Sequence, residues 1–243
     1  MAVRTRGADR LLAWGGAVSF LISLAFGVAS YLGPFGRPIP LRAWPDEAEA
    51  IAINIGLFTL FAAHHSVMAR GRAKAWIKSI LPSHLERSTY VWIASLLFLM
   101  VCGLWRPVGG EVYRLESLAA VAAVALQAAG VLLTAAGVSI LSWSELAGVR
   151  QALQATTHEV GEGHKTFSRG VYGFVRHPLY LGWMLMTLGT PHLTGTRLVF
   201  GVVSSAYLLA AIPWEERSLI AEHGEPYLRY RSQVRWRVVP GIY

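Results

Sequence analysis

The chain has 243 residues, of which 54% are hydrophobic and only 15% are charged, whereas a soluble globular domain carries about 25% charged residues. Because the apolar residues lie in long blocks, this composition places the chain in a membrane. The single cysteine excludes a disulfide framework and a cysteine-based metal cluster. The formal net charge of +8 does not by itself indicate a nucleic-acid partner, since most Lys and Arg stand between the apolar blocks, as membrane topology requires.

Six apolar blocks follow one another along the chain. They cover approximately residues 11–33, 48–69, 89–105, 117–141, 178–195 and 198–214. Because a membrane-spanning helix needs roughly 20 residues, the blocks predict an all-α, polytopic membrane helix bundle with about six transmembrane helices. The last two blocks are joined by very little chain, which predicts a tight C-terminal helical hairpin.

The basic residues favour one orientation in the membrane. Of the 22 Lys and Arg, 17 fall in the N-terminal segment, the connections after the second and fourth blocks, and the C-terminal segment, while 5 fall in the other connections. Lys and Arg are enriched in cytoplasmic segments. We therefore expect a multi-pass protein of the inner (cytoplasmic) membrane with both termini in the cytoplasm.

A basic motif, Arg176-His177-Pro178-Leu179-Tyr180, stands at the start of the fifth block. Pro178 lacks an N–H and suits the first turn of a helix, so His177 is expected at the helix entrance. Helix N-termini favour anions, and we expect a carboxylate or another anion here with Arg176 as its partner. The alternative is that Arg176 anchors the topology and His177 is an interfacial cap.

Two acidic residues, Glu215 and Glu216, directly follow the sixth block, on the same side of the predicted hairpin as Arg176. Glutamates at a helix C-terminus oppose the helix dipole, so they need a partner such as Arg176, Arg217 or a bound cation. Ionisable groups at the membrane border are costly, and this makes them candidates for a functional site. A solvated interfacial pair is the alternative.

Three other groups of polar or aromatic side chains are candidates for a functional role. His64 and His65 point to different faces of a helix and cannot chelate one metal as an i,i+4 pair would; no metal site is predicted. Glu145 is a lone carboxylate after the fourth block, either a helix-end residue or a site wall. Tyr227 and Tyr230 stand among arginines and indicate an interfacial belt, although such rings could also cover an adenine. The sequence lacks a Rossmann fingerprint, a P-loop, an H-E-x-x-H motif and a serine elbow.

Several of these motifs occur together with specific spacing between residues 165 and 240. They are Gly170-Val171-Tyr172, Arg176 to Gly182, Glu215-Glu216, Gly224, Tyr227, Tyr230 and Pro240. In this combination they resemble the C-terminal core of the isoprenylcysteine carboxyl methyltransferase-like membrane enzymes. The N-terminal half is similar to the methanethiol S-methyltransferase branch of that family, which has NnrU-type relatives. That similarity rests on His65 to Arg70, Glu86 to Tyr90, Trp105 to Pro107, Glu145 to Gly148 and Arg150-Gln151.

The resemblance implies an S-adenosylmethionine-dependent methyltransferase whose cofactor lies at the cytoplasmic membrane surface. The residues it places in the cofactor pocket are His164, Lys165, Thr166, Phe167, Tyr172, His177, Pro178, Leu179, Tyr180 and Glu215. We expect a single integral membrane domain over residues 1–243, with N-terminal helices in 1–141 and the cofactor-binding core in 142–243. No obligate protein partner is evident.

The acceptor implied by the resemblance is a small hydrophobic thiol, namely methanethiol, which would give dimethyl sulfide. Arg176 and His177 suit the donor's carboxylate, and Glu215 suits its cationic end. A small thiol has a pKa well above neutrality, so a base is useful; His65 is the first choice and Glu145 the second. The alternatives are a lipid or isoprenylcysteine carboxylate acceptor, and a non-catalytic NnrU-type membrane protein.

Overall fold

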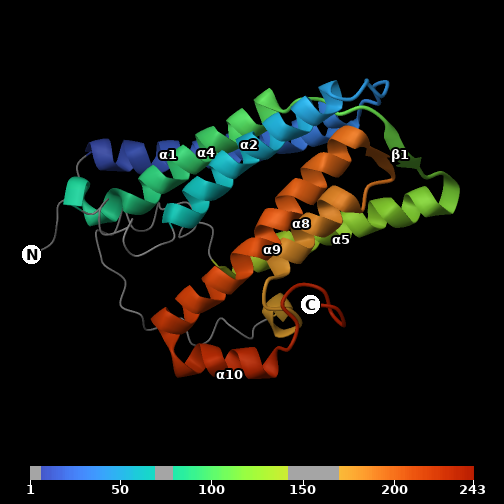
Figure 1. Cartoon of the computed structure of the whole chain (residues 1–243). Helices are drawn as coiled ribbons and strands as arrows, with labels where there is room; N and C mark the ends of the chain where they lie inside the picture. The colour runs from blue at the N-terminus through green and yellow to red at the C-terminus, as the bar shows by residue number, and fades with distance from the viewer. Residues whose placement is uncertain (1–6, 69–78, 142–169) are drawn as a thin grey trace, which may run out of the picture. The chain divides into compact units, whose positions relative to one another are not determined.

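The computed structural model describes residues 7–68, 79–141 and 170–243 (Figure 1). The described chain is almost entirely helical. Its helices are α1 (Gly7–Leu32), α2 (Asp46–Met68), α4 (Glu86–Leu104), α5 (Ser117–Leu141), α8 (Pro178–Leu188), α9 (Gly195–His223) and α10 (Glu225–Gln233). Short 3₁₀ turns lie at Pro34–Gly36 (η1), Ser83–Leu85 (η2) and Gly170–Gly173 (η4), and two short strands are formed by Glu111–Arg114 (β1) and His192–Thr194 (β2).

The described helices confirm a multi-pass membrane bundle and correct one of its predicted spans. Five of them, α1, α2, α4, α5 and α9, are long and apolar enough to cross a membrane. The fifth apolar block instead forms α8, which has 11 residues. A helix of that length rises about 16 Å, whereas the hydrocarbon core is about 30 Å thick. Helix α8 ends before Gly189 and Pro191, and Pro191 has no N–H to continue it.

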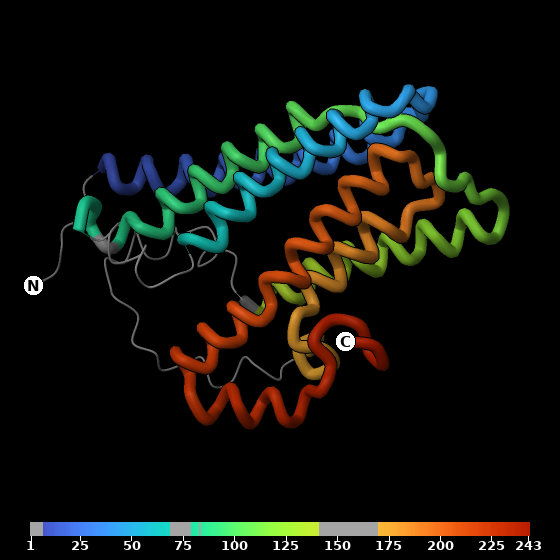
Figure 2. The backbone as a smooth tube through the Cα atoms, viewed as in Figure 1, coloured from blue at the N-terminus to red at the C-terminus, as the bar shows by residue number. Residues whose placement is uncertain are grey.

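Contacts divide the chain into two compact units. The described part of the first unit contains α1, α2 and α4, which run side by side (Figure 2). Trp92 of α4 lies against glycines of α1, because a Cβ at Gly15 would stand only 2.7 Å from its ring. The indole N–H of Trp92 donates to the Leu12 carbonyl at 2.9 Å. The small residues of α1 thus make room for a large ring that joins the two helices.

Two buried polar side chains of α2 hold the connections of the first unit. Asn54 is fully buried; its Nδ2 donates to the Arg106 carbonyl at 2.8 Å, and its Oδ1 accepts from the Arg106 N–H at 2.7 Å. Glu47, also buried, accepts from the backbone N–H groups of Arg42 at 2.9 Å and Gly109 at 3.0 Å. These bonds satisfy backbone groups just beyond the helices, where unpaired groups would be costly.

The second unit contains α5, α8, α9 and α10, with the antiparallel pair β1–β2. Helix α8 packs on both α5 and α9, so the predicted C-terminal hairpin is confirmed, with β2 in its connection. Gly224 has φ +60°, a conformation that favours glycine, and it separates α9 from α10. Helix α5 belongs to this unit. The division into N-terminal helices (1–141) and a cofactor-binding core (142–243) stays a prediction. That residues 1–243 form one domain stays a prediction.

Candidate active site

The entrance of α8 is bonded to the end of the chain. His177 is the N-cap of α8 and Pro178 its first residue, as the sequence predicts. The N–H groups of Arg176 and His177 donate to the carbonyls of Trp236 at 2.9 Å and Arg237 at 2.8 Å. Residues 234–243, the C-terminal tail, are thereby attached to the loop that precedes α8.

Arg176 is buried, and its hydrogen bonds are made within the protein. Its Nε donates to Oε1 of Glu216 at 2.7 Å. Its Nη1 donates to the carbonyls of Val234 at 2.8 Å and Arg235 at 2.9 Å. The described anionic partner of this guanidinium is therefore Glu216 of α9. A role in holding a donor carboxylate stays a prediction.

Glu215 is the more accessible of the two adjacent glutamates, with 43% of its side chain exposed against 4% for Glu216. The Tyr180 hydroxyl donates to Oε2 of Glu215 at 2.7 Å. The His177 ring stacks on Tyr180, with centroids 5.2 Å apart and planes 22° apart, and its Nδ1 lies 3.6 Å from the same Glu215 oxygen. The structure thus places the side chains of His177 and Tyr180 at the partly exposed carboxylate of Glu215.

The predicted helix end at residue 214 is wrong. Helix α9 continues to His223, so Glu215 and Glu216 lie inside a helix and the argument from the helix dipole does not apply. Pro213 is accommodated within α9, although an internal proline commonly ends or kinks a helix. The charge of Glu216 is compensated by Arg176 and Arg237.

The tyrosines near the tail are core residues. Tyr227 and Tyr230 are 1% and 4% exposed and pack with Val234, so their assignment to an interfacial belt is wrong. The Tyr230 hydroxyl donates to the carbonyl of Tyr172 at 2.9 Å. Burial raises the pKa of Tyr172 to about 12, and the negative charge of Glu215 adds to the shift. Tyr172 therefore stays protonated at neutral pH.

Two further predicted cofactor residues form the first turn of α8. Pro178 is buried. Leu179 lies against α5, since a Cβ at Gly137 would stand 2.8 Å from its Cδ2 and 3.8 Å from the Tyr172 hydroxyl. Glycine at 137 is thus what allows Leu179 and Tyr172 to approach α5.

His65 belongs to the first unit, where it pairs with a tyrosine that sequence reasoning did not single out. The Tyr90 hydroxyl is hydrogen-bonded to Nδ1 of His65. The His64 ring stacks on Tyr90, with centroids 5.4 Å apart, and the Arg87 guanidinium lies 4.9 Å from the centre of the same ring. The motif Glu86 to Tyr90 contained Tyr90, but no spacing rule joined it to His65, 25 residues earlier. Glu145 and His164 to Phe167 lie outside the described residues.

Known proteins match this chain in the segment that contains the site and over most of its length. The family model of the isoprenylcysteine carboxyl methyltransferase (ICMT) family matches residues 140–221. Methanethiol S-methyltransferase 2 of Bradyrhizobium diazoefficiens is 38% identical over 217 residues, which cover 89% of this chain and 83% of the relative. The methanethiol S-methyltransferase of Crocosphaera subtropica is 35% identical, with coverage of 89% and 86%, and that of Mycobacterium tuberculosis is 34% identical, with coverage of 90% and 92%. No solved structure matches significantly.

The chain belongs to the methanethiol S-methyltransferase family. It is therefore a multi-pass membrane methyltransferase, and its family implies a methyl donor. The matched stretch of the ICMT model contains Arg176 to Tyr180 together with Glu215 and Glu216. The site around Glu215 thus lies in the segment that the wider methyltransferase family shares.

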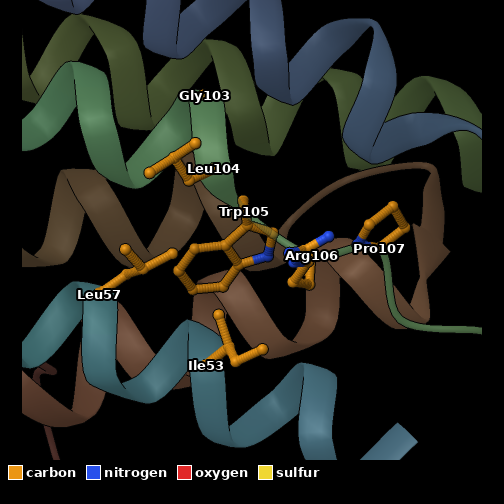
Figure 3. Close-up of a pocket in the computed structure, with 7 residues that line it drawn as sticks. All are labelled: Ile53, Leu57, Gly103, Leu104, Trp105, Arg106 and Pro107. Carbon is orange, nitrogen blue, oxygen red and sulfur yellow. The ribbon is translucent and has the colours of Figure 1, made fainter. Parts of the chain in front are cut away.

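A cavity of about 330 Å³ in the first unit contains none of these residues. Figure 3 shows its lining, in which the Trp105 indole faces side chains of α2. The lining residues are Ile53, Leu57, Gly103, Leu104, Trp105, Arg106 and Pro107. The candidate active site of this methyltransferase is defined by the contacts around Glu215.

Proposed function

We propose that this methyltransferase transfers a methyl group from S-adenosylmethionine to methanethiol, giving dimethyl sulfide. The acceptor is supported by the relatives named methanethiol S-methyltransferase, which are similar over most of both chains. The donor is supported by one feature of the site above all. Glu215 is a partly exposed carboxylate that its neighbours orient but no described cation neutralises at hydrogen-bonding distance.

The residues present fit a donor that carries positive charge. S-adenosylmethionine, when bound, supplies a methyl group on a sulfonium. Glu215 would hold the cationic end, and Tyr180 would fix the direction of that carboxylate through its 2.7 Å hydrogen bond. The positive end of the α8 dipole would favour the donor's carboxylate, with Arg176 and His177 beside it.

The remaining pocket residues extend this proposal. Tyr172, Pro178 and Leu179 are proposed to form a wall of the donor pocket, and Tyr172 remains a neutral phenol at working pH because burial raises its pKa to about 12. His164, Lys165, Thr166 and Phe167 are proposed to complete the pocket. We further propose that this site opens to the cytoplasm and that both termini lie on that side.

The acceptor loses a proton before its sulfur forms the new C–S bond. The sulfonium C–S bond breaks in the same step, its electron pair returns to the donor sulfur, and two neutral thioethers result. His65 is proposed as the base and Glu145 as the second choice. For Nε2 of His65 to accept a proton, Nδ1 must carry hydrogen and donate to the Tyr90 oxygen. The observed contact between Tyr90 and Nδ1 can hold that tautomer.

Replacing Glu215 with glutamine tests the proposal. The variant removes the negative charge and keeps the shape, so we expect donor affinity by calorimetry and turnover both to fall by at least about tenfold, as when one partner of a charge pair is truncated. Glu222→Gln is the matched control, because Glu222 is an exposed glutamate of the same helix. Unchanged affinity and rate in Glu215→Gln would remove Glu215 from the site.

The acceptor is tested in parallel. Cells that make the protein and are fed methanethiol should release dimethyl sulfide, measured by gas chromatography of the headspace. A methylated product in the lipid extract instead would favour the lipid or isoprenylcysteine acceptor. Failure to bind S-adenosylmethionine at all would favour a non-catalytic NnrU-type role.

A further inference from the structure

The two adjacent glutamates of α9 have opposite surroundings. Glu215 is 43% exposed, whereas only 4% of the Glu216 side chain is accessible. Glu216 forms ion pairs with Nε of Arg176 at 2.7 Å and Nε of Arg237 at 3.6 Å, and Nε2 of His177 lies 3.5 Å from its Oε1. A carboxylate enclosed in this way is satisfied by the protein itself and has little surface left for a ligand.

The partners of Glu216 come from two segments that are far apart in the sequence. Arg176 and His177 precede α8, and Arg237 lies in the C-terminal tail. Arg176 also donates to the carbonyls of Val234 at 2.8 Å and Arg235 at 2.9 Å. The tail is therefore attached to the α8 entrance through a guanidinium whose charge is balanced by Glu216. Removing that balance leaves a buried unpaired cation, which is strongly unfavourable.

His177 connects Glu216 to the exposed carboxylate. Its Nε2 lies 3.5 Å from Glu216 and its Nδ1 lies 3.6 Å from Glu215, so one ring stands between the two glutamates. The ring plane is set by stacking on Tyr180, and Tyr180 in turn bonds to Glu215. A displacement of Glu216 therefore moves the ring that helps to orient Glu215.

We propose that Glu216 is a positioning residue of the methyl-donor site: it fastens the C-terminal tail to the entrance of α8 and aligns His177, and thereby Glu215, for the donor. This inference rests on the proposed function. The two adjacent glutamates then have different roles. Glu215 would contact the donor, while Glu216 holds in place the segments that form the site. The same geometry makes the tail a component of the donor site.

The test compares Glu216→Gln with the wild type in two independent measurements. Because Glu216 does not touch the reacting atoms, we expect the KM for S-adenosylmethionine to rise at least about tenfold while kcat at saturating donor stays within about threefold. We also expect trypsin to cut after Arg235 and Arg237 faster than in the wild type. Mass spectrometry of the released tail peptides reports that loosening directly.

Two further variants keep the test informative if Glu216→Gln folds poorly. Arg237→Gln removes one ion pair without unpairing Arg176, and the Arg237 side chain is 35% exposed. It also removes one trypsin site, so its cleavage is compared after Arg235 alone; that cleavage and the donor KM should rise by smaller factors. Glu216→Asp keeps the charge and should restore part of the donor affinity. Glu222→Gln is the control and should match the wild type in both readouts.

Several outcomes would overturn the inference. A kcat that falls with an unchanged donor KM would make Glu216 a catalytic group. A lower melting temperature with unchanged donor KM and unchanged tail cleavage would make it a residue of fold stability only. If the wild type itself fails to bind S-adenosylmethionine by calorimetry, the proposed function fails; faster tail cleavage in Glu216→Gln would then still show that Glu216 fastens the tail.

Discussion

The substitution Gly182→Ala tests whether the close packing of α8 on α5 positions the candidate active site. A Cβ at 182 would lie 2.3 Å from Oγ1 of Thr134 and 2.8 Å from the Gly130 carbonyl oxygen, both far inside ordinary van der Waals distance. The Thr134 hydroxyl is bonded to the Gly130 carbonyl at 2.9 Å, so neither atom moves away without disturbing α5. The two helices must therefore separate.

The expected size of the effect follows from these contacts. Overpacking a well-packed interior costs about 1–3 kcal/mol, and contact with a backbone carbonyl places this substitution at the upper end. Alanine offsets about 1 kcal/mol through its better helix propensity. We expect the free energy of unfolding to fall by about 2 kcal/mol, which lowers Tm by about 4–8 °C for a chain of this size.

Thermal unfolding in detergent, followed by tryptophan fluorescence, measures this loss. Gly56→Ala is the matched control, because nothing lies within 4 Å of a Cβ at Gly56 in α2, and it should be neutral or slightly stabilising. Donor affinity should also fall in Gly182→Ala, since α8 carries His177 at its N-terminus. If both variants had the same Tm and the same donor affinity, the close packing of α5 and α8 would determine neither the stability of the protein nor the geometry of the donor site.

Two other predictions concern stability. Asn54→Leu removes both hydrogen bonds to the Arg106 backbone and leaves two backbone groups unpaired, so the free energy of unfolding should fall by about 2–4 kcal/mol; an unchanged Tm would show that water replaces the amide. The pKa of Tyr172 is raised to about 12 from an ordinary 10, and the folded state therefore holds this proton more tightly than the unfolded state. Its contribution is complete below about pH 10 and is lost as pH rises toward 12. Tm measured across that range should fall, and less steeply in Tyr172→Phe; equal slopes would refute a buried phenol at this position.

The sequence predicted those features that depend on local rules. Apolar block length located five of the spans, because a helix in lipid must bury its backbone polar groups itself. The ring of Pro178, which lacks an N–H, placed His177 at the entrance of α8. Motif spacing in residues 165–240 indicated the family, and comparison with known relatives confirmed it.

The features that were missed depend on contacts between distant segments. The end of the apolar block and the acidic pair indicated a helix end, but α9 continues to His223. Glu216 is neutralised there by Arg176 and Arg237, which lie 40 residues before and 21 after it in the printed sequence. The burial of Tyr227 under the tail was hidden for the same reason. Neither partner can be read from the local pattern of α9.

The most direct measurement uses purified protein in lipid vesicles with methanethiol and S-adenosylmethionine carrying a trideuterated methyl group. Gas chromatography with mass spectrometry should detect dimethyl sulfide bearing the labelled methyl group from the wild type and from Glu222→Gln, and little from Glu215→Gln. Labelled dimethyl sulfide at the wild-type rate from Glu215→Gln, or none from a wild type that binds the donor, would contradict the account.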